Sequence, residues 1–341
     1  MKSITHYDVT NLDYSGYFAV GLRANARNLG YRYNVSRTLP TRLSEAAAVT
    51  PGMETIAIFE AKTSDQQFWF CIDGHDINSA YRIPILEHVQ YYFKVNYDRE
   101  AITSNEELEA FQHKILPTGP SFPIRVPRWQ YRPSLSGTRW EYRRNWGRLC
   151  HLSRLGTLER LIHYRTEPKT RDVAFIVPYY NENQHTQANE FRYEVMEQLG
   201  RRANLHADYG FVGHVVPDKF KKYHVERVSP QNHLQRLASS RVAIYVRGLH
   251  DCVSYKFGEM LSLGLPIAGQ TVRSNSEMLG GYPHFTEQFS YDEPDALVDR
   301  VEELIADPDS RSSIACSNMN IFDAHLSPVA VTREILRTIC M

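Results

Sequence analysis

The chain has 341 residues, of which 42% are hydrophobic and 23% charged, values typical of a globular protein long enough for two domains. Lysine plus arginine equals aspartate plus glutamate at 39 each, so the overall charge gives no argument for a polyanionic partner. Five scattered cysteines without a Cys-x-x-Cys pair argue against a disulfide framework or a structural zinc site, and they favour a reducing compartment.

The first part of the chain alternates predicted strands and helices. We expect strands at residues 3–9, 31–35, 54–59, 67–72 and 89–96, and helices at 18–29, 83–88 and 106–114. A polar turn at residues 10–16 contains a glycine and separates the first strand from the first helix, which stops at Gly30. Strand, glycine loop, helix and strand form the opening of a Rossmann-like unit.

The pattern weakens between residues 117 and 170, where prolines recur and three tryptophans lie among arginines. We expect an irregular connection here, rich in arginine and aromatic residues at about 118–168, with one helix near residues 149–164. The domain boundary should fall near Lys169, which divides the chain into residues 1–168 and 169–341.

A second alternating unit follows. We expect strands at residues 172–177, 209–213 and 241–246, and helices at 186–202, 230–239, 295–306, 309–322 and 329–339. Residues 251–270 of this unit predict a loop, an apolar helix that stops at Gly264, and a short apolar strand, with charge at the helix start. Backbone N–H groups at a helix start are unpaired and electropositive, so they can hold phosphates and sugar hydroxyls.

Asp251 stands eight positions before Glu259, which opens the apolar helical run, and a Gly-Leu-Pro-Ile turn follows that run. This arrangement resembles the two-domain nucleotide-sugar glycosyltransferases of the GT-B type, many of which carry an acidic-x7-Glu pair before an Ala/Leu-rich helix and a Gly-x-Pro turn. The resemblance is strongest over residues 172–322. It implies an α/β fold with two Rossmann-like domains that face a cleft, a second domain that binds the donor, and a last helix that crosses back to the first domain.

The resemblance also implies donor-binding residues. Glu259 matches a glutamate that accepts hydrogen bonds from ribose hydroxyls, a task that suits an acceptor-only carboxylate. The alternative is a helix-start acid that complements the macrodipole. Asp251 matches the acid that faces the transferred sugar, although most relatives have Glu there, and a plain loop aspartate is the alternative.

Further donor-side candidates surround this pair. Lys256 and Arg247 are candidate cations for the diphosphate, because its departure builds negative charge on oxygen. Ser254 is expected chiefly to cap the helix and otherwise to contact a phosphate. Gly213 allows close backbone approach and Tyr179 is placed to stack on a base or sugar, while an ordinary turn glycine and an exposed loop tyrosine are the alternatives.

Acceptor-side candidates come from two predicted loops of the first domain. Asp13 and Gly16 lie in the loop after the first strand, and His75 and Asp76 follow a later strand. Asp13 or Asp76 is the candidate catalytic base that would deprotonate an acceptor hydroxyl. Turn-forming residues explain the sequence Asp-Gly-His-Asp at 73–76 almost as well.

We expect no required metal and no cofactor, since the nucleotide-sugar is a substrate. The acids and histidine at 73–76 are too tightly spaced to ligate one ion together. The Asp307-Pro308-Asp309 sequence fits a helix stop and N-cap better than a metal motif. The N-terminal sequence lacks an apolar signal region, and no run reaches the roughly 18 apolar residues that span a bilayer. We therefore expect a cytoplasmic protein, with peripheral membrane contact left open.

The stretch from Arg125 to Arg144 mixes guanidinium groups with aromatic rings. That composition suits nucleic acid, an anionic surface or a phosphorylated glycan, and it also suits a solvated linker whose aromatics pack between domains. The sequence predicts a metal-independent glycosyltransferase that acts on a hydroxyl of a glycan, glycolipid or natural product. A phage-type transferase for DNA bases, a non-catalytic nucleotide- or glycan-binding protein and a sugar-nucleotide epimerase remain alternatives.

Overall fold

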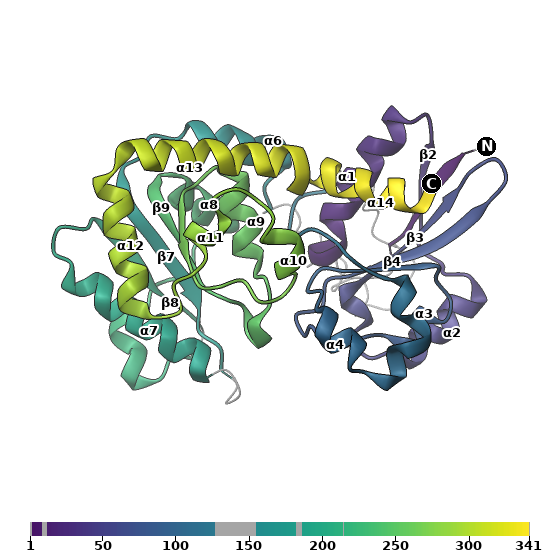
Figure 1. The fold of residues 1–341 in the computed structure, drawn as a ribbon, viewed down its shortest axis with the longest axis horizontal. Coiled ribbons are helices and arrows are strands. Elements are labelled where there is room, and N and C mark those ends of the chain that lie inside the picture. The colour runs from purple at the N-terminus through teal and green to yellow at the C-terminus, as the bar shows by residue number, and fades with distance from the viewer. Residues whose placement is uncertain (1, 9–11, 127–154, 182–185, 214, 341) are drawn as a thin grey trace, which may run out of the picture. The chain divides into compact units, whose positions relative to one another are not determined.

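The computed structural model describes residues 2–8, 12–126, 155–181, 186–213 and 215–340 (Figure 1). The chain divides into two compact units. The first unit combines Met1–Leu158 with Ala324–Met341, and the second is Glu159–Asp323. Each unit is an α/β structure built around a largely parallel sheet, which confirms the predicted fold class. The last helix belongs to the first unit, as the resemblance implied.

The first unit contains a six-stranded sheet in the order β2-β1-β3-β4-β5-β6. Its strands are β1 (Ser3–Tyr7), β2 (Arg32–Ser36), β3 (Ile56–Lys62), β4 (Gln67–Asp73), β5 (Tyr91–Lys94) and β6 (Ile115–Pro117). Neighbouring strands are parallel except for β3, which runs antiparallel to both β1 and β4. The link from β3 to β4 is a tight turn in which the N–H of Thr63 donates to the carbonyl of Gln66 at 2.9 Å. This turn is too short for a crossover helix, so β3 and β4 form a hairpin.

Helices cover this sheet on both faces. They are α1 (Leu12–Asn28), α2 (Thr41–Val49), α3 (Ile83–Leu86), α4 (Arg99–Thr103), the 3-10 helix η2 (Glu106–Lys114) and α14 (Pro328–Cys340). Tyr7, Ile58 and Cys71 share one sheet face and form a buried cluster with residues of α2 and α3. On the opposite face the rings of His6, Phe59 and Phe70 stack in series, with centroids 4.8 and 5.2 Å apart.

Helix α14 packs directly on α1. A Cβ atom added to Gly21 would lie 1.9 Å from the carbonyl oxygen of Pro328, so only glycine permits this approach. The Nδ2 group of Asn25 donates to the carbonyl of Val329 and to Oγ1 of Thr332, each at 2.8 Å. The last helix is therefore an integral layer of the first unit.

The second unit contains four parallel strands in the order β10-β9-β7-β8. They are β7 (Arg171–Pro178), β8 (Ala207–Val212), β9 (Ser240–Tyr245) and β10 (Ile267–Gly269). The helices are α6 (Leu158–His163), α7 (Thr186–Arg201), α8 (Pro230–Ala238), α9 (Tyr255–Ser262), α10 (Ser276–Leu279), α11 (Phe285–Gln288), α12 (Pro294–Ala306) and α13 (Pro308–Ile321). The chain leaves β7 towards β8 and later returns to place β9 on the other side of β7. The strand order therefore reverses between β7 and β9, at the position where open α/β sheets bind ligands.

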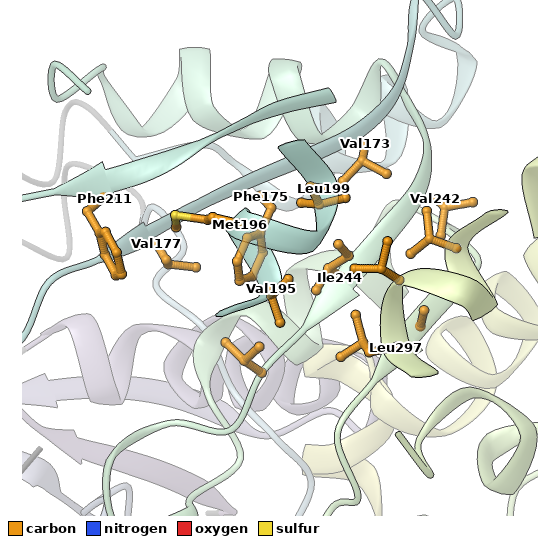
Figure 2. Close-up of a cluster of buried hydrophobic side chains, with 14 of the residues drawn as sticks. Val173, Phe175, Val177, Val195, Met196, Leu199, Phe211, Val242, Ile244 and Leu297 are labelled. Carbon is orange, nitrogen blue, oxygen red and sulfur yellow. The ribbon is translucent and has the colours of Figure 1, made fainter. Parts of the chain in front are cut away.

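Figure 2 shows the core of the second unit. Alternate residues Val173, Phe175 and Val177 of β7 meet Met196 and Leu199 of α7. Strand β9 and helix α12 add further buried aliphatic side chains to the same cluster, among them Val242, Ile244 and Leu297. This packing fixes the sheet, and with it the positions at which β7 and β9 end. Within the described ranges, no helix is both long and apolar enough to span a membrane.

Candidate functional site

Two neighbouring cavities lie where β7 and β9 end in the second unit. The first, here called cavity A, has a volume of about 150 Å³, and its walls come from β7, β9, α8 and the start of α9. The second, cavity B, has a volume of about 280 Å³ and is lined by α7 and by the loop after β9. Arg192 and Val246 line both cavities. The structure thus forms two concave spaces, an apolar one with a few polar groups and a more polar one, where the strand order reverses between β7 and β9.

A cluster of three titratable side chains lies at cavity A. The ammonium of Lys256 donates to Oε2 of Glu259 at 2.9 Å and also hydrogen-bonds Nε2 of His233. Burial, and to a smaller extent the positive charge of Lys256, lowers the pKa of His233 to about 4. The imidazole is therefore neutral at pH 7 and accepts a hydrogen bond from the ammonium. Lys256 and His233 line the cavity. Glu259 does not line it but forms an ion pair with Lys256.

Glu259 is the fifth residue of α9, one turn beyond the helix start, and its side chain is 13% exposed. No acidic residue lies in the first turn of α9. Because dipole stabilisation fades beyond the first turn, the alternative role of Glu259 as a helix-start acid is weakened.

Ser254 occupies the N-cap position of α9, but its side chain makes no capping hydrogen bond. The expectation that Ser254 chiefly caps this helix was therefore wrong. Its Oγ is buried and, within the described structure, has no hydrogen-bond partner. The residue lines cavity A, so the hydroxyl is held at a ligand-sized space rather than used in the helix.

Arg247 and Asp251 belong to a charge network along cavity B. Nε of Arg247 lies 2.9 Å from Asp251 Oδ1, and NH1 lies 3.0 Å from Asp292 Oδ1. Asp251 also pairs with Arg273 at 2.8 Å. His250 and Asp251 both adopt left-handed backbone conformations, with φ of 56° and 59°, so this loop is strained. Arg247 and Asp251, the two residues predicted to contact the donor here, are thus each paired with side chains of opposite charge.

Tyr179 and Gly213 lie beside the site without lining either cavity. The ring of Tyr179 packs on Phe211 and Phe220, with centroids 5.8 and 5.4 Å away. Gly213 follows β8, and its carbonyl oxygen lies 3.2 Å from Nε2 of His224. In the structure Tyr179 is part of an aromatic cluster, and the tyrosine that does line cavity A is Tyr180.

Arg192, Tyr180 and His233 are cavity residues that the sequence analysis missed. Arg192 is only 3% exposed although it carries a full charge. A sequence signal for it existed, because Arg192 interrupts the stripe of buried positions along α7 that includes Val195 and Leu199. An arginine on the apolar face of a helix needs a polar partner in the interior, and here that partner set lies at the ends of β7 and β9.

The acceptor-side candidates lie in the first unit. Asp13 and Gly16 fall within α1, which begins at Leu12, so the expected loop at residues 10–16 is shorter than predicted. Gly16 is buried, and a Cβ there would lie 3.1 Å from the carbonyl oxygen of Ile124. Close packing against the 122–126 segment lets the helix begin before the glycine. Gly16 therefore has a packing role in this structure.

His75 and Asp76 follow β4, and buried contacts of Asp73, the last residue of that strand, fix the loop that carries them. Asp73 is fully buried, pairs with Lys94 at 2.8 Å, and accepts hydrogen bonds from Tyr92 at 2.6 Å and from the His75 N–H at 2.8 Å. Burial lowers the pKa of His75, and the charge of Arg82 lowers it further. Nδ1 of His75 accepts the Ile77 N–H at 3.2 Å, which places the proton of the neutral ring on Nε2.

The 73–76 loop and the first turn of α1 lie side by side. A Cβ added to Gly74 would lie 2.8 Å from Cδ1 of Tyr14, the residue after Asp13. The two predicted base candidates, Asp13 and Asp76, thus come from neighbouring segments at one edge of the sheet. Both are partly exposed.

Two other expectations concern metal and nucleic acid. Asp307 is the N-cap of α13 and accepts hydrogen bonds from the N–H groups of Asp309 and Ser310 at 3.1 and 3.0 Å, as the helix-cap interpretation predicted. Among the described residues, no three His, Cys, Asp or Glu side chains are grouped to hold a metal ion. The Arg125 to Arg144 stretch lies outside the described residues except for its first two.

Residues 189–337 match the sequence model of a family described as Glycosyl transferase-like. This region is glycosyltransferase-like. It begins in α7, includes every residue from Arg192 to Glu259 discussed above, and ends in α14. The match covers less than half of the chain, and it confirms the predicted resemblance to glycosyltransferases where the motif lies. No curated protein gives a significant match to the sequence.

Several solved structures are similar to the chain at low identity. TarM from S. aureus, solved with UDP among its ligands, is 10% identical over 75% of this chain and 45% of that one, with a TM-score of 0.44. A phage T4 BGT mutant in complex with UDP-glucose is 10% identical over 98% of both chains, with a TM-score of 0.43. Anabaena HepE in complex with UDP-glucose is 10% identical over 78% of this chain and 70% of that one, with a TM-score of 0.43. The chain spans less than half the length of the TarM chain.

Proposed function

We propose that the protein is a glycosyltransferase that moves a sugar from a nucleotide-sugar donor to an acceptor hydroxyl. The observation that carries this proposal is the position of cavity A. It lies at the switch point between β7 and β9, inside the glycosyltransferase-like region, and it is lined by Ser254 and Lys256 from the predicted motif. The donor's nucleotide would bind here.

In this proposal Glu259 has two tasks. Its Oε2 accepts from Lys256 at 2.9 Å and so keeps the ammonium at the cavity wall. Glu259 lines neither cavity, so its second oxygen would accept a ribose hydroxyl from the edge of cavity A, using a lone pair that Lys256 does not occupy. As the bond between the sugar and the diphosphate breaks, the cations at the cavity stabilise the charge that builds on the leaving oxygens.

The acceptor side of the proposal depends on the first unit. Asp13 and Asp76 remain the proposed bases for the acceptor proton, since each is a partly exposed carboxylate at the same edge of the sheet. His75 is a poorer base, because Nδ1 already accepts the Ile77 N–H and Nε2 carries the proton. We propose that the transfer needs no metal, since protein cations already stand at the donor cavity.

A thermal-shift screen with UDP-, GDP-, CMP- and TDP-sugars tests the donor class. A ligand that binds only the folded protein raises its melting temperature by mass action, so one class of nucleotide should stand out. Glu259→Gln should remove most of that shift, whereas Glu303→Gln, an exposed acid on α12, should keep it. If no nucleotide-sugar shifts the wild-type transition, the proposal is wrong.

Product analysis separates the remaining classes of function. Incubation with the donor alone distinguishes an epimerase, which needs no acceptor, from a transferase. A panel of glycan, lipid and duplex DNA acceptors then identifies the acceptor class, and strong salt dependence with DNA would favour the base-modifying alternative. Nucleotide binding without turnover on any acceptor or on water would indicate a binding protein.

A further inference from the structure

We infer that Arg192, Ser254 and Lys256, which line cavity A, form a phosphate-binding subsite, and that Arg192 rather than Arg247 supplies its guanidinium. The inference rests on the proposed function, because the diphosphate of a donor is the anion that would bind. It also goes beyond that function, since Arg192 comes from α7 and no sequence motif pointed to it.

Arg192 is a buried cation, and no carboxylate among the described residues pairs with it. Its NH1 donates to the carbonyl of Pro178 at 3.0 Å and its NH2 to the carbonyl of Arg247 at 3.3 Å, so it bridges the segments that end β7 and β9. The guanidinium lies 4.4 Å from the centroid of the Tyr180 ring. Its Nε is buried and has no hydrogen-bond partner within the described structure. A buried charge is unfavourable unless an opposite charge compensates it, so the site favours an anion.

Two more side chains on the wall of cavity A have hydrogen-bond donors that could serve a ligand. The hydroxyl of Ser254 is buried and, among the described residues, has no partner. Lys256 has three ammonium protons, and Glu259 and His233 accept hydrogen bonds from two of them. His233 is neutral at pH 7 because burial lowers its pKa to about 4. It therefore positions Lys256 as an acceptor, without adding a charge that would repel the ammonium.

No acidic side chain of the described residues lines cavity A. Its volume of about 150 Å³ exceeds the roughly 30 Å³ that one water occupies in the liquid, which leaves space for a group larger than a water molecule. Arg247 differs from Arg192 in charge balance. Its guanidinium lies within 3.0 Å of both Asp251 and Asp292, which leaves no net positive charge for a ligand.

Isothermal titration of the full chain with inorganic pyrophosphate tests the subsite without any assumption about base or sugar. Wild type should bind, and Arg192→Gln should weaken binding by about tenfold or more, as expected for a lost charge-assisted hydrogen bond. Arg201→Gln, an exposed arginine on the same helix, serves as the matched control and should bind within about twofold of wild type.

Ser254→Ala gives a signature that structural damage cannot imitate. Removal of a buried hydroxyl without a partner should leave the melting temperature of the free protein unchanged or raise it. The same substitution should weaken pyrophosphate binding by about threefold to tenfold, because a hydrogen bond to the anion is lost. This variant also keeps the inference testable if Arg192→Gln does not fold.

Three results would overturn the inference: no pyrophosphate binding by wild type up to about 10 mM, unchanged affinity in folded Arg192→Gln, or unchanged affinity in Ser254→Ala. The outcomes separate the subsite from the enzyme. Pyrophosphate binding that depends on Arg192, without sugar transfer from any donor, would retain the subsite and refute the proposed function. Sugar transfer that is unchanged by substitution of Arg192 and Ser254 would refute the subsite and retain the proposed function.

Discussion

Lys94 and Asp73 form an ion pair whose side chains have no exposed surface, and Tyr92 donates a further hydrogen bond to the same carboxylate. Lys94 also donates to the carbonyls of His75 and Ala80, at 3.4 and 3.2 Å. One buried ammonium therefore holds both ends of the loop that carries His75 and Asp76. Such a pair is weak evidence for stability by itself, but loss of one member leaves an uncompensated charge in the core.

Lys94→Met should destabilise the protein by about 3–5 kcal/mol, because the Asp73 carboxylate would remain buried without its cation. Urea unfolding measures the loss. The double variant Lys94→Met/Asp73→Leu should recover much of it, since both charges are then gone. A double variant as unstable as the single one would show that the loop geometry, and not the charge, is what Lys94 supplies.

Acid sensitivity also arises from single residues. Burial lowers the pKa of His6 to about 3 and that of His233 to about 4, against 6.5 for an exposed histidine. Between pH 4 and 6.5 the unfolded chain binds protons that the folded chain refuses, so the free energy of unfolding falls as the pH drops through this window. The stabilisation is fully present above pH 6.5.

Replacement of His233 by Gln should flatten this pH dependence. The full shift at His233 corresponds to a contribution on the order of 3 kcal/mol between pH 6.5 and 4. Urea unfolding at a series of pH values measures the slope for wild type and variant. His113→Gln, on an exposed side chain, is the control and should keep the wild-type slope. Identical slopes for His233→Gln and wild type would contradict the assignment.

At the scale of elements, the contact between α1 and α14 depends on Gly21, which has no side chain. Gly21→Ala would place a Cβ 1.9 Å from the carbonyl oxygen of Pro328, so the two helices must move apart. We expect a loss of about 1–3 kcal/mol, as for other overpacked core positions, although alanine favours a helix more than glycine does. Guanidinium unfolding checks this, with Asn28→Ala on the exposed end of α1 as the control. A Gly21→Ala protein as stable as wild type would refute the close packing.

The elements of the second unit could be predicted well from sequence. Its strands are buried on both sheet faces and appear as short apolar runs, and each predicted strand at 172–177, 209–213 and 241–246 overlaps a strand of the structure. Helices α8 and α13 begin with a proline, and Ser229 and Asp307 cap them, so their starts are visible in the sequence.

Prediction failed where tertiary contacts override local signals. The glycine at position 16 suggested a turn, yet it allows α1 to pack against the 122–126 segment. Arg192 interrupts the apolar stripe of α7, but the sequence does not reveal its partners, which are backbone carbonyls at the ends of distant strands. Ser254 looked like a cap from its position alone. The packing of Gly16, the partners of Arg192 and the unused hydroxyl of Ser254 all depend on tertiary contacts, which have no local sequence pattern.

At the scale of the whole molecule, the two units have separate cores, but the first is assembled from two stretches of chain. Helix α14 buries Ala330, Val331, Ile335, Leu336 and Ile339. The apolar face of α14 therefore packs into the first unit, although helices α12 and α13, which precede it in sequence, belong to the second.

Removal of residues 324–341 should destabilise the first unit and spare the second. In a background where the tryptophans at positions 129, 140 and 146 are replaced by phenylalanine, the fluorescence of Trp69 in β4 reports the first unit. The fluorescence transition should move to a lower urea concentration, because the apolar face of α1 becomes exposed. The pyrophosphate affinity of cavity A should stay within about twofold of the full chain. A fluorescence transition that does not move would show that α14 contributes little.

The two-part construction of the first unit has a consequence for biosynthesis. On the ribosome, strands β1–β6 and helix α1 emerge early, but the helix that covers α1 is made only after residue 323. The nascent chain must keep that surface exposed while the whole second unit is translated, and the second unit can finish first. Chaperones that recognise apolar surface should therefore bind the early product, and release should coincide with the addition of α14.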